Sequence, residues 1–226
     1  MKILMVLTSH AELGDSGHKT GFWLEEFAAP YYVFKDAGAE ITLASPAGGQ
    51  PPIDPNSEND DAQTDDTRRF ADDPDARARL SATHKLSEVT IDNFDAVFYP
   101  GGHGPLYDLF DDADSLALIK KATAHDKIVS AVCHAPAVFL KAETANGEPL
   151  LRGRKVTAFS NSEESAVGLA EIVPYLLEDE LQKQGASYHR AGDWASNVVV
   201  DGRLITGQNP ASSAATARAV VAALKS

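Results

Sequence analysis

The run AVCHAP at residues 131–136 contains the only cysteine of the chain, Cys133, with a histidine, His134, directly after it. The mostly apolar segment 127–133 is typical of a buried strand, and a helix is expected from about residue 135. A cysteine at such a junction lies at the carboxyl edge of a parallel sheet, where these sheets bind ligands. Because a helix amino terminus lowers the pKa of a thiol, Cys133 is a candidate nucleophile with His134 as its base. The alternative is a buried cysteine that serves only as a small apolar side chain.

Two further segments offer groups that this chemistry would need. PGGHGPLYD at 100–108 follows a short apolar run, and its glycine turn can present backbone N–H groups as an oxyanion hole. FSNSEES at 159–165 supplies Glu163 and Glu164, either of which can orient a histidine, unless both only cap a helix. These segments predict a site built from several loops at one edge of a sheet.

Two other candidates are less well defined by their positions. Glu25 and Glu26 are adjacent on the first expected helix, so only one can face inward, and their spacing does not say which. Trp194, in AGDWASN, can line the pocket, although an aromatic residue in a late loop more often makes ordinary packing contacts. The residues alone therefore assign no role to either position.

Short apolar runs alternate with longer amphipathic segments along most of the chain. The runs predict buried strands, and the longer segments, with apolar residues at helical spacing, predict helices. The expected strands span 2–8, 40–45, 96–100, 127–133 and 155–160, and the expected helices span 22–39, 113–125, about 135 onward, 173–186 and a segment opening at Asn209-Pro210. VVVDGRLIT predicts a hairpin that turns at Asp201-Gly202. The alternation predicts an α/β fold whose mostly parallel sheet is covered on both faces.

Composition and charge fit one globular domain over residues 1–226. The chain is 43% apolar and 23% charged, which is ordinary for such proteins. A net charge of -13 opposes phosphate backbones and anionic lipids, so neither nucleic acid nor a membrane is expected as a partner. The opening apolar run is too short for a signal sequence or a membrane span, and a lone cysteine suits a reducing cytoplasm.

Residues 46–90 interrupt the alternation of strands and helices. The stretch from Asp54 to Asp75 carries nine acidic residues against two basic ones. We expect either a surface excursion with one short helix around 66–80 or a partial cover over the site, because long ordered loops are often functional. The acidic residues lack the spacing of a calcium loop, so no metal is expected there.

Three motifs together resemble the PfpI/DJ superfamily, relatives of class I glutamine amidotransferases: GGHG at 101–104, AVCHAP at 131–136 and FSNSEE at 159–164. The resemblance covers essentially the whole chain. Four more segments resemble its heat-shock-chaperone-like branch of glutathione-independent glyoxalases (glyoxalase III) and protein deglycases: KTGFWLEEFAAP (19–30), PIDPNS (52–57), GEPLLRGRKVTAFS (147–160) and DGRLITGQNPASS (201–213). The resemblance implies a flavodoxin-like three-layer sandwich, an insertion at 46–90 near the active site, and a homodimer.

The resemblance also implies roles for individual residues. Cys133 falls on the family nucleophile, and His134 falls on the histidine beside it. The acid that orients this histidine falls on Glu164 rather than on Glu163. Glu26 falls on the glutamate that hydrogen-bonds the nucleophilic sulfur.

The oxyanion-stabilising positions of the family fall on Gly102 and on the N–H of His134, and His103 lines the same pocket. True amidotransferases use a catalytic histidine from a distant His-x-Glu motif near the carboxyl terminus. The late histidine here reads His189-Arg190-Ala191, so glutaminase activity is not expected.

The implied activity is a lyase (hydro-lyase) reaction that converts methylglyoxal or a similar small 2-oxoaldehyde to a 2-hydroxy acid such as lactate, with a Cys-His-Glu triad. Because oxidation of one carbon balances reduction of its neighbour, this reaction is expected to need no cofactor and no metal. The resemblance extends to deglycase activity. The alternatives are a stress-related holdase chaperone and a redox sensor in which Cys133 is oxidised to a sulfinate. Peptidase activity ranks lower, since a crowded pocket suits small carbonyl compounds.

Overall fold

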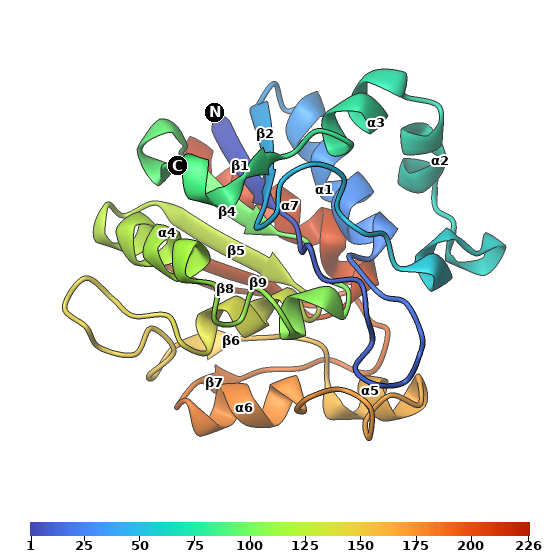
Figure 1. Ribbon diagram of the computed structural model, residues 1–226. Coiled ribbons are helices and arrows are strands. Elements are labelled where there is room, and N and C mark those ends of the chain that lie inside the picture. Colours follow the sequence, from blue (N-terminus) through green and yellow to red (C-terminus); the bar gives the residue numbers. More distant parts are fainter.

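A seven-stranded sheet forms the middle of the computed structural model, which describes all residues, 1–226 (Figure 1). The strands lie in the order β3-β2-β1-β4-β5-β9-β8, and every neighbouring pair is parallel except β8 with β9. Their bounds are β1 (Lys2–Val6), β2 (Glu40–Ser45), β3 (His84–Lys85), β4 (Ala96–Tyr99), β5 (Ile128–Val132), β8 (Val198–Asp201) and β9 (Leu204–Gly207). The direction of winding reverses between β1 and β4, and open parallel sheets bind ligands beside such a reversal, at the carboxyl ends of the strands.

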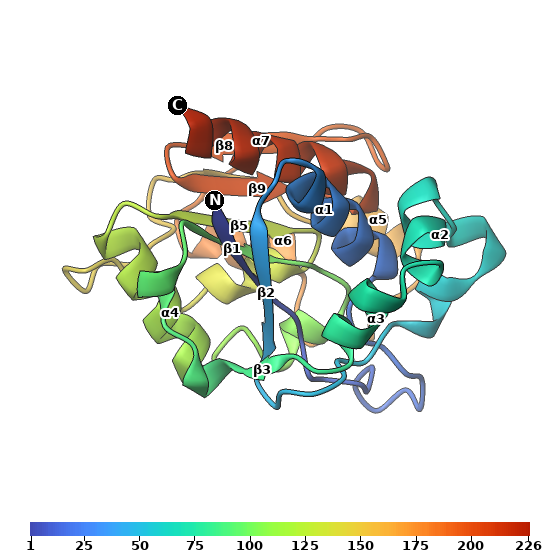
Figure 2. The same ribbon diagram turned by 90° about the horizontal axis from the view of Figure 1, so that it is seen from above.

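Helices cover both faces of this sheet, as Figures 1 and 2 show. They are α1 (Leu24–Asp36) and α7 (Ser213–Lys225) on one face, and α4 (Ala113–Ala124) and α6 (Leu177–Lys183) on the other. Successive residues of β1 alternate between the two apolar cores, with Leu4 and Val6 on the α4 side and Ile3 and Met5 on the α1 side. This period of two is what a strand buried on both faces requires. The expected flavodoxin-like three-layer sandwich is confirmed.

The segment 46–90 contains two α-helices where one was predicted around 66–80. They are α2 (Asp65–Ala71) and α3 (Pro74–Leu80), and short 3₁₀ helices lie around them at η1 (Pro55–Glu58), η2 (Asp60–Ala62), η3 (Leu86–Glu88) and η4 (Ile91–Asn93). The break falls at Asp73, whose carboxylate accepts the N–H of Ala76 at 2.9 Å and caps α3. Pro74 then fills the first helical position, where its missing N–H has no intrahelical partner to lose.

Two other predicted elements are shorter than expected. The strand predicted at 155–160 is β6 (Lys155–Val156), which pairs with β7 (Ser187–Tyr188) in a separate two-stranded sheet. On the side away from β7, the N–H of Thr157 donates to the side chain of Thr206 in β9 at 2.9 Å, so this segment meets β9 through a side chain and not through a backbone ladder. The helix predicted from residue 173 begins only at Leu177, because Leu176 has an extended backbone, with a φ of -79° and a ψ of 116°.

Other predictions hold closely. The strand predicted at 40–45 has those bounds, and Gly38 follows the end of α1 with a φ of 77°, a left-handed conformation that glycine adopts without strain. The hairpin β8–β9 turns at Asp201-Gly202, as predicted. The remaining short helices are η5 (Gly104–Leu106), η6 (Ala135–Phe139), α5 (Asn161–Ala166) and η7 (Pro210–Ser212). None of the helices combines the length and the apolar character that crossing a bilayer requires.

Segment 46–90 joins the rest of the fold through a backbone bridge just before α1. The N–H of Phe22 donates to the carbonyl of Pro52 at 3.0 Å, and the N–H of Asp54 donates to the carbonyl of Phe22 at 2.9 Å. At Gly21 the two chains come so close that a Cβ would lie 2.0 Å from the Pro52 carbonyl oxygen. Only glycine fits this approach.

We therefore expect Gly21→Ala to destabilise the protein by about 1 to 3 kcal/mol, the usual range for overpacking. In a chain of this size that loss lowers the Tm by about 2 to 12 °C. The matched control is Gly192→Ala, because a Cβ at Gly192 meets no atom within 4 Å and its backbone needs no positive φ. Thermal unfolding followed by circular dichroism measures both, and equal Tm values for the two variants would contradict the account.

Candidate active site

Cys133 follows β5 directly and has a left-handed backbone, with a φ of 61°. Two backbone hydrogen bonds hold it there: its N–H donates to the carbonyl of Gly207 at 3.0 Å, and its carbonyl accepts the N–H of Phe159 at 2.9 Å. For a residue with a side chain this conformation costs of order 1 to 3 kcal/mol, and such strain is characteristic of functional sites. This sharp turn directs the side chain of Cys133 away from the axis of β5 and brings the sulfur beside His134.

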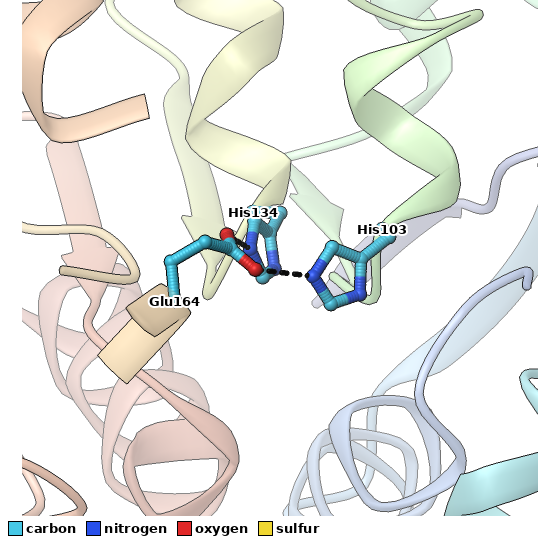
Figure 3. Close-up of side chains that lie close together, drawn as sticks. All are labelled: His103, His134 and Glu164. Carbon is cyan, nitrogen blue, oxygen red and sulfur yellow. Dashed lines mark hydrogen bonds and ion pairs between the residues drawn. The ribbon is translucent and has the colours of Figure 1, made fainter. Parts of the chain in front are cut away.

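A chain of short polar contacts runs from the sulfur to Glu164. Sγ of Cys133 lies 3.2 Å from Nδ1 of His134, and Nε2 of His134 lies 2.6 Å from a carboxylate oxygen of Glu164. The other oxygen of Glu164 lies 2.8 Å from Nε2 of His103, so one carboxylate bridges two imidazoles (Figure 3). Because an ionised carboxylate only accepts hydrogen bonds, His134 carries its proton on Nε2 and presents an unprotonated Nδ1 to the sulfur.

Glu163 and Glu164 have separate tasks, although both lie in the first turn of α5. Glu163 is fully buried, and its carboxylate accepts hydrogen bonds from the backbone and hydroxyl of Ser160, which is the helix N-cap. It also accepts the N–H of Trp194 at 2.9 Å and side-chain N–H groups from Gln208 and Asn209. Glu163 thus fixes the start of α5, and Glu164 is the residue that reaches the histidines.

Glu26 is the acid of the first helix that faces inward, whereas Glu25 faces segment 46–90 and accepts the hydroxyl of Thr64 at 2.5 Å. The side chain of Glu26 is fully buried, and neither carboxyl oxygen has a hydrogen-bond partner of good geometry. The Cys133 sulfur and the N–H groups of Gly101 and Gly102 are the polar groups that face it. No cation compensates this carboxyl group.

The two glycines after β4 let the backbone pass beneath the carboxyl group of Glu26. A Cβ at Gly101 would lie 2.3 Å from Oε2 of Glu26 and 2.4 Å from the carbonyl oxygen of Val132. Gly102 has a φ of 94°, and its N–H lies beside the Cys133 sulfur, where it favours the ionised thiol. The sequence singled out Gly102 but not Gly101; the doubled glycine was the signal that was available.

The pKa of the Cys133 thiol is raised, which corrects the sequence-based expectation that a helix would lower it. Burial is the largest cause, followed by the negative charge of Glu26. The predicted helix from residue 135 is only the five-residue 3₁₀ helix η6, too short to supply a strong terminal dipole. Burial likewise raises the pKa of Glu26 to about 8, so Glu26 is protonated at neutral pH. Cys133 and Glu26 together therefore carry at most one negative charge near pH 7.

The pKa values of His134 and Glu164 move in the directions that general base chemistry needs. Burial, and then the nearby charge of His103, lower the pKa of His134, so its imidazole is neutral at rest. Burial alone would raise the pKa of Glu164, but the charge of His134 and the hydrogen bonds from both histidines outweigh burial and lower it. An ionised Glu164 can stabilise the imidazolium that forms when His134 accepts a proton.

The site is closely enclosed. Cys133 is 3% exposed, and His103 at 8% is the most exposed of the groups around it. The ring of Trp194 lies 5.8 Å from that of Phe159, which in turn lies 4.4 Å from that of His134, so Trp194 is one ring removed from the site. A groove of about 1010 Å³ lies at the opposite edge of the sheet, next to Arg154 and Arg203, and contains none of these groups.

Comparison with known proteins places this geometry in a family. The sequence model described as "DJ-1/PfpI family" matches residues 19–223. "Glyoxalase 3" of Candida albicans is 35% identical, with 100% of this chain and 99% of that protein covered, and "Glutathione-independent glyoxalase HSP31" of Saccharomyces cerevisiae is 32% identical, with 99% and 98% covered.

Solved structures agree with this result. The crystal structure of glyoxalase III from Candida albicans has a TM-score of 0.92 and 33% identity, with 99% of this chain and 97% of that chain covered. Rapid Encystment Protein 24 KDa of Francisella tularensis has a TM-score of 0.93 and 38% identity, with 99% and 98% covered. The chain belongs to the DJ-1/PfpI family.

Proposed function

We propose that the protein is a glutathione-independent glyoxalase that converts methylglyoxal or a similar small 2-oxoaldehyde to a 2-hydroxy acid. The observation that carries the proposal is the contact of the Cys133 sulfur with His134, which is backed by Glu164, together with the buried acid Glu26 beside the same sulfur. The names of the two relatives, which are glyoxalases, support the same reaction.

The first step joins the sulfur to the aldehyde carbon. The Cys133 thiol gives its proton to Nδ1 of His134 as it attacks, and Glu164 stabilises the imidazolium. The developing oxyanion lies near the N–H groups of Gly102 and His134 and then takes the proton of the His134 imidazolium or of the Glu26 carboxyl group, which completes a hemithioacetal and leaves that group free to act as the base of the next step. His103 supports the step by holding the other oxygen of Glu164.

The second step moves hydrogen between neighbouring carbons. His134 or Glu26 removes the former aldehyde proton to give an enediol, and a proton then returns to the adjacent carbon, which leaves a thioester on Cys133. Water hydrolyses the thioester, releases lactate and restores the thiol. The aldehyde carbon is oxidised while its neighbour is reduced, so the reaction is a net addition of water and needs no external redox partner.

Glu26 suits a proton-transfer role because its pKa of about 8 lies close to neutral pH. A general acid or base works best when its pKa is near the working pH. In its protonated form Glu26 also adds no charge that would oppose a thiolate at Cys133. For both reasons, the enzyme is expected to be active when the carboxyl group of Glu26 is protonated.

The wider description of the protein belongs to the same proposal. We take residues 1–226 as one domain with segment 46–90 as an insertion, and the protein as a homodimer, on the strength of the sequence resemblance. We place it in the cytoplasm because a lone cysteine suits a reducing compartment. An enzyme is favoured over a holdase because only four large apolar side chains are exposed: Val167, Ile172, Trp194 and Val200. A holdase needs a larger apolar surface.

We expect purified protein to form lactate from methylglyoxal without added thiol, and Cys133→Ala to lower kcat/KM by at least about 1000-fold, as loss of a nucleophile does. The matched control is Ser130→Ala in β5, which removes a buried hydroxyl that has no hydrogen-bond partner. Enzymatic lactate detection measures all three proteins. Full turnover by Cys133→Ala would overturn the proposal.

Replacing Glu26 by glutamine should lower kcat by about 100-fold or more, since general acid–base catalysis contributes about 10² to 10⁴. In the wild type, kcat/KM should fall as the pH rises above about 8, because the ionised carboxylate opposes ionisation of the thiol. The residual activity of Glu26→Gln should lack this alkaline limb. Glu25→Gln serves as the control, and an unchanged pH profile for Glu26→Gln would count against the role of Glu26.

The same titration predicts how stability depends on pH. The folded pKa of Glu26 is about 8, against 4.5 for the ordinary carboxyl, so the folded state binds more protons than the unfolded state between these values. The contribution of Glu26 to the unfolding free energy therefore falls as the pH rises from about 4.5 to 8, by up to about 5 kcal/mol at 1.4 kcal/mol per pH unit. Glu26→Gln removes the titration, so its Tm should rise relative to the wild type from pH 5 to pH 9. A Tm difference that does not change with pH would contradict this prediction.

A further inference from the structure

Two imidazoles and one carboxylate converge in the enclosed region beside Cys133. One ligand-type atom from each of His103, His134 and Glu164 lies within 4.8 Å of the other two (Figure 3). All three residues are buried, and the two imidazole rings are only 4.0 Å apart between centroids. In the proposed reaction His134 is the imidazole that transfers protons, whereas His103 only holds the other oxygen of Glu164.

We propose that His103, His134 and Glu164 form a zinc site and that zinc bound there switches the enzyme off. Two histidines and a glutamate are a donor set that zinc takes in proteins, with a water in the fourth position. Zinc is then a reversible inhibitor, not a cofactor, since the reaction sequence given above uses no metal.

The distances fit this ion after a small movement. The two nitrogens now lie 2.6 and 2.8 Å from the carboxylate oxygens, joined by hydrogen bonds. Zinc bonds of about 2.1 Å in tetrahedral geometry hold ligand atoms about 3.4 Å apart, so each nitrogen–oxygen separation must widen by less than about 1 Å. The metal takes the place of the two bridging protons.

The sulfur of Cys133 lies outside this donor set. It is 3.2 Å from Nδ1 of His134, whereas Nε2, on the other side of the ring, faces Glu164. One metal ion cannot use Nε2 of His134 and the sulfur together without turning the ring. The site therefore differs from ordinary zinc capture by a reactive thiol.

Zinc at Nε2 would disable the proton acceptor of the reaction. An imidazole that binds a metal through Nε2 carries its remaining proton on Nδ1, which here points at the sulfur. His134 then has no lone pair for the thiol proton, and Glu164 no longer backs it. This inhibitory consequence rests on the proposed function, but the binding itself does not.

The chain as a whole favours the approach of a cation. Its net charge of -13 attracts positive ions, and His103, at 8%, is the most exposed of the three proposed ligands. His103 is thus the residue on which zinc binding should depend most clearly.

The test is a calorimetric titration of the full-length protein with zinc, which should give one site per chain. His103→Gln should raise the Kd at least about 100-fold, because losing even an outer partner of a metal ligand costs about 10- to 100-fold. His84→Gln alters an exposed histidine on β3 and should leave the Kd within about two-fold. Cys133→Ser should bind zinc as the wild type does.

A second measurement needs no variant. Cobalt(II) bound to the wild type should give the visible bands of a nitrogen and oxygen site without a thiolate-to-metal charge-transfer band. Absence of stoichiometric binding, a strong charge-transfer band, or binding that is lost in Cys133→Ser but kept in His103→Gln would overturn the proposal. An inactive wild type with intact zinc binding would instead overturn the glyoxalase assignment alone.

Discussion

The carboxyl group of Glu26 is buried against the sulfur of Cys133 with no cation to neutralise it, and this enclosure governs the chemistry of both groups. Two negative charges cannot coexist there, so the pair keeps a proton near neutral pH. Reactivity then depends on where that proton is at each step. In the proposed reaction His134 accepts it from the sulfur side, and Glu164 makes this possible by remaining ionised.

The fold creates this enclosure by bringing loops from separate strands to one edge of the sheet. Gly101 lies under the Glu26 carboxyl group, where any side chain would collide with it. Glu163 accepts hydrogen bonds from neutral donors and so fixes the start of α5. The start of α5 in turn determines the position of Glu164. The site thus rests on close backbone approaches and buried hydrogen bonds, both of which need a rigid sheet behind them.

The sequence predicted the features that depend on local pattern, but not those that depend on the packing of distant segments. Alternation of apolar residues predicted the strands and the layer order, and the Cys133-His134 junction predicted a side chain at the carboxyl edge. The direction of the thiol pKa was wrong because burial and the charge of Glu26 arise only when distant segments meet. The close contacts of Gly101 and Gly21 escaped notice for the same reason.

Because Cys133 has a left-handed backbone, stability and the proposed reactivity favour different amino acids at this position. Glycine would relax that conformation but would bring no sulfur. A redesign procedure that ranks substitutions by folding energy alone would favour removing the sulfur atom on which the proposed reaction depends. To make this protein more thermostable, substitutions on surfaces remote from residue 133 are therefore preferable to substitutions that relieve the backbone strain at residue 133.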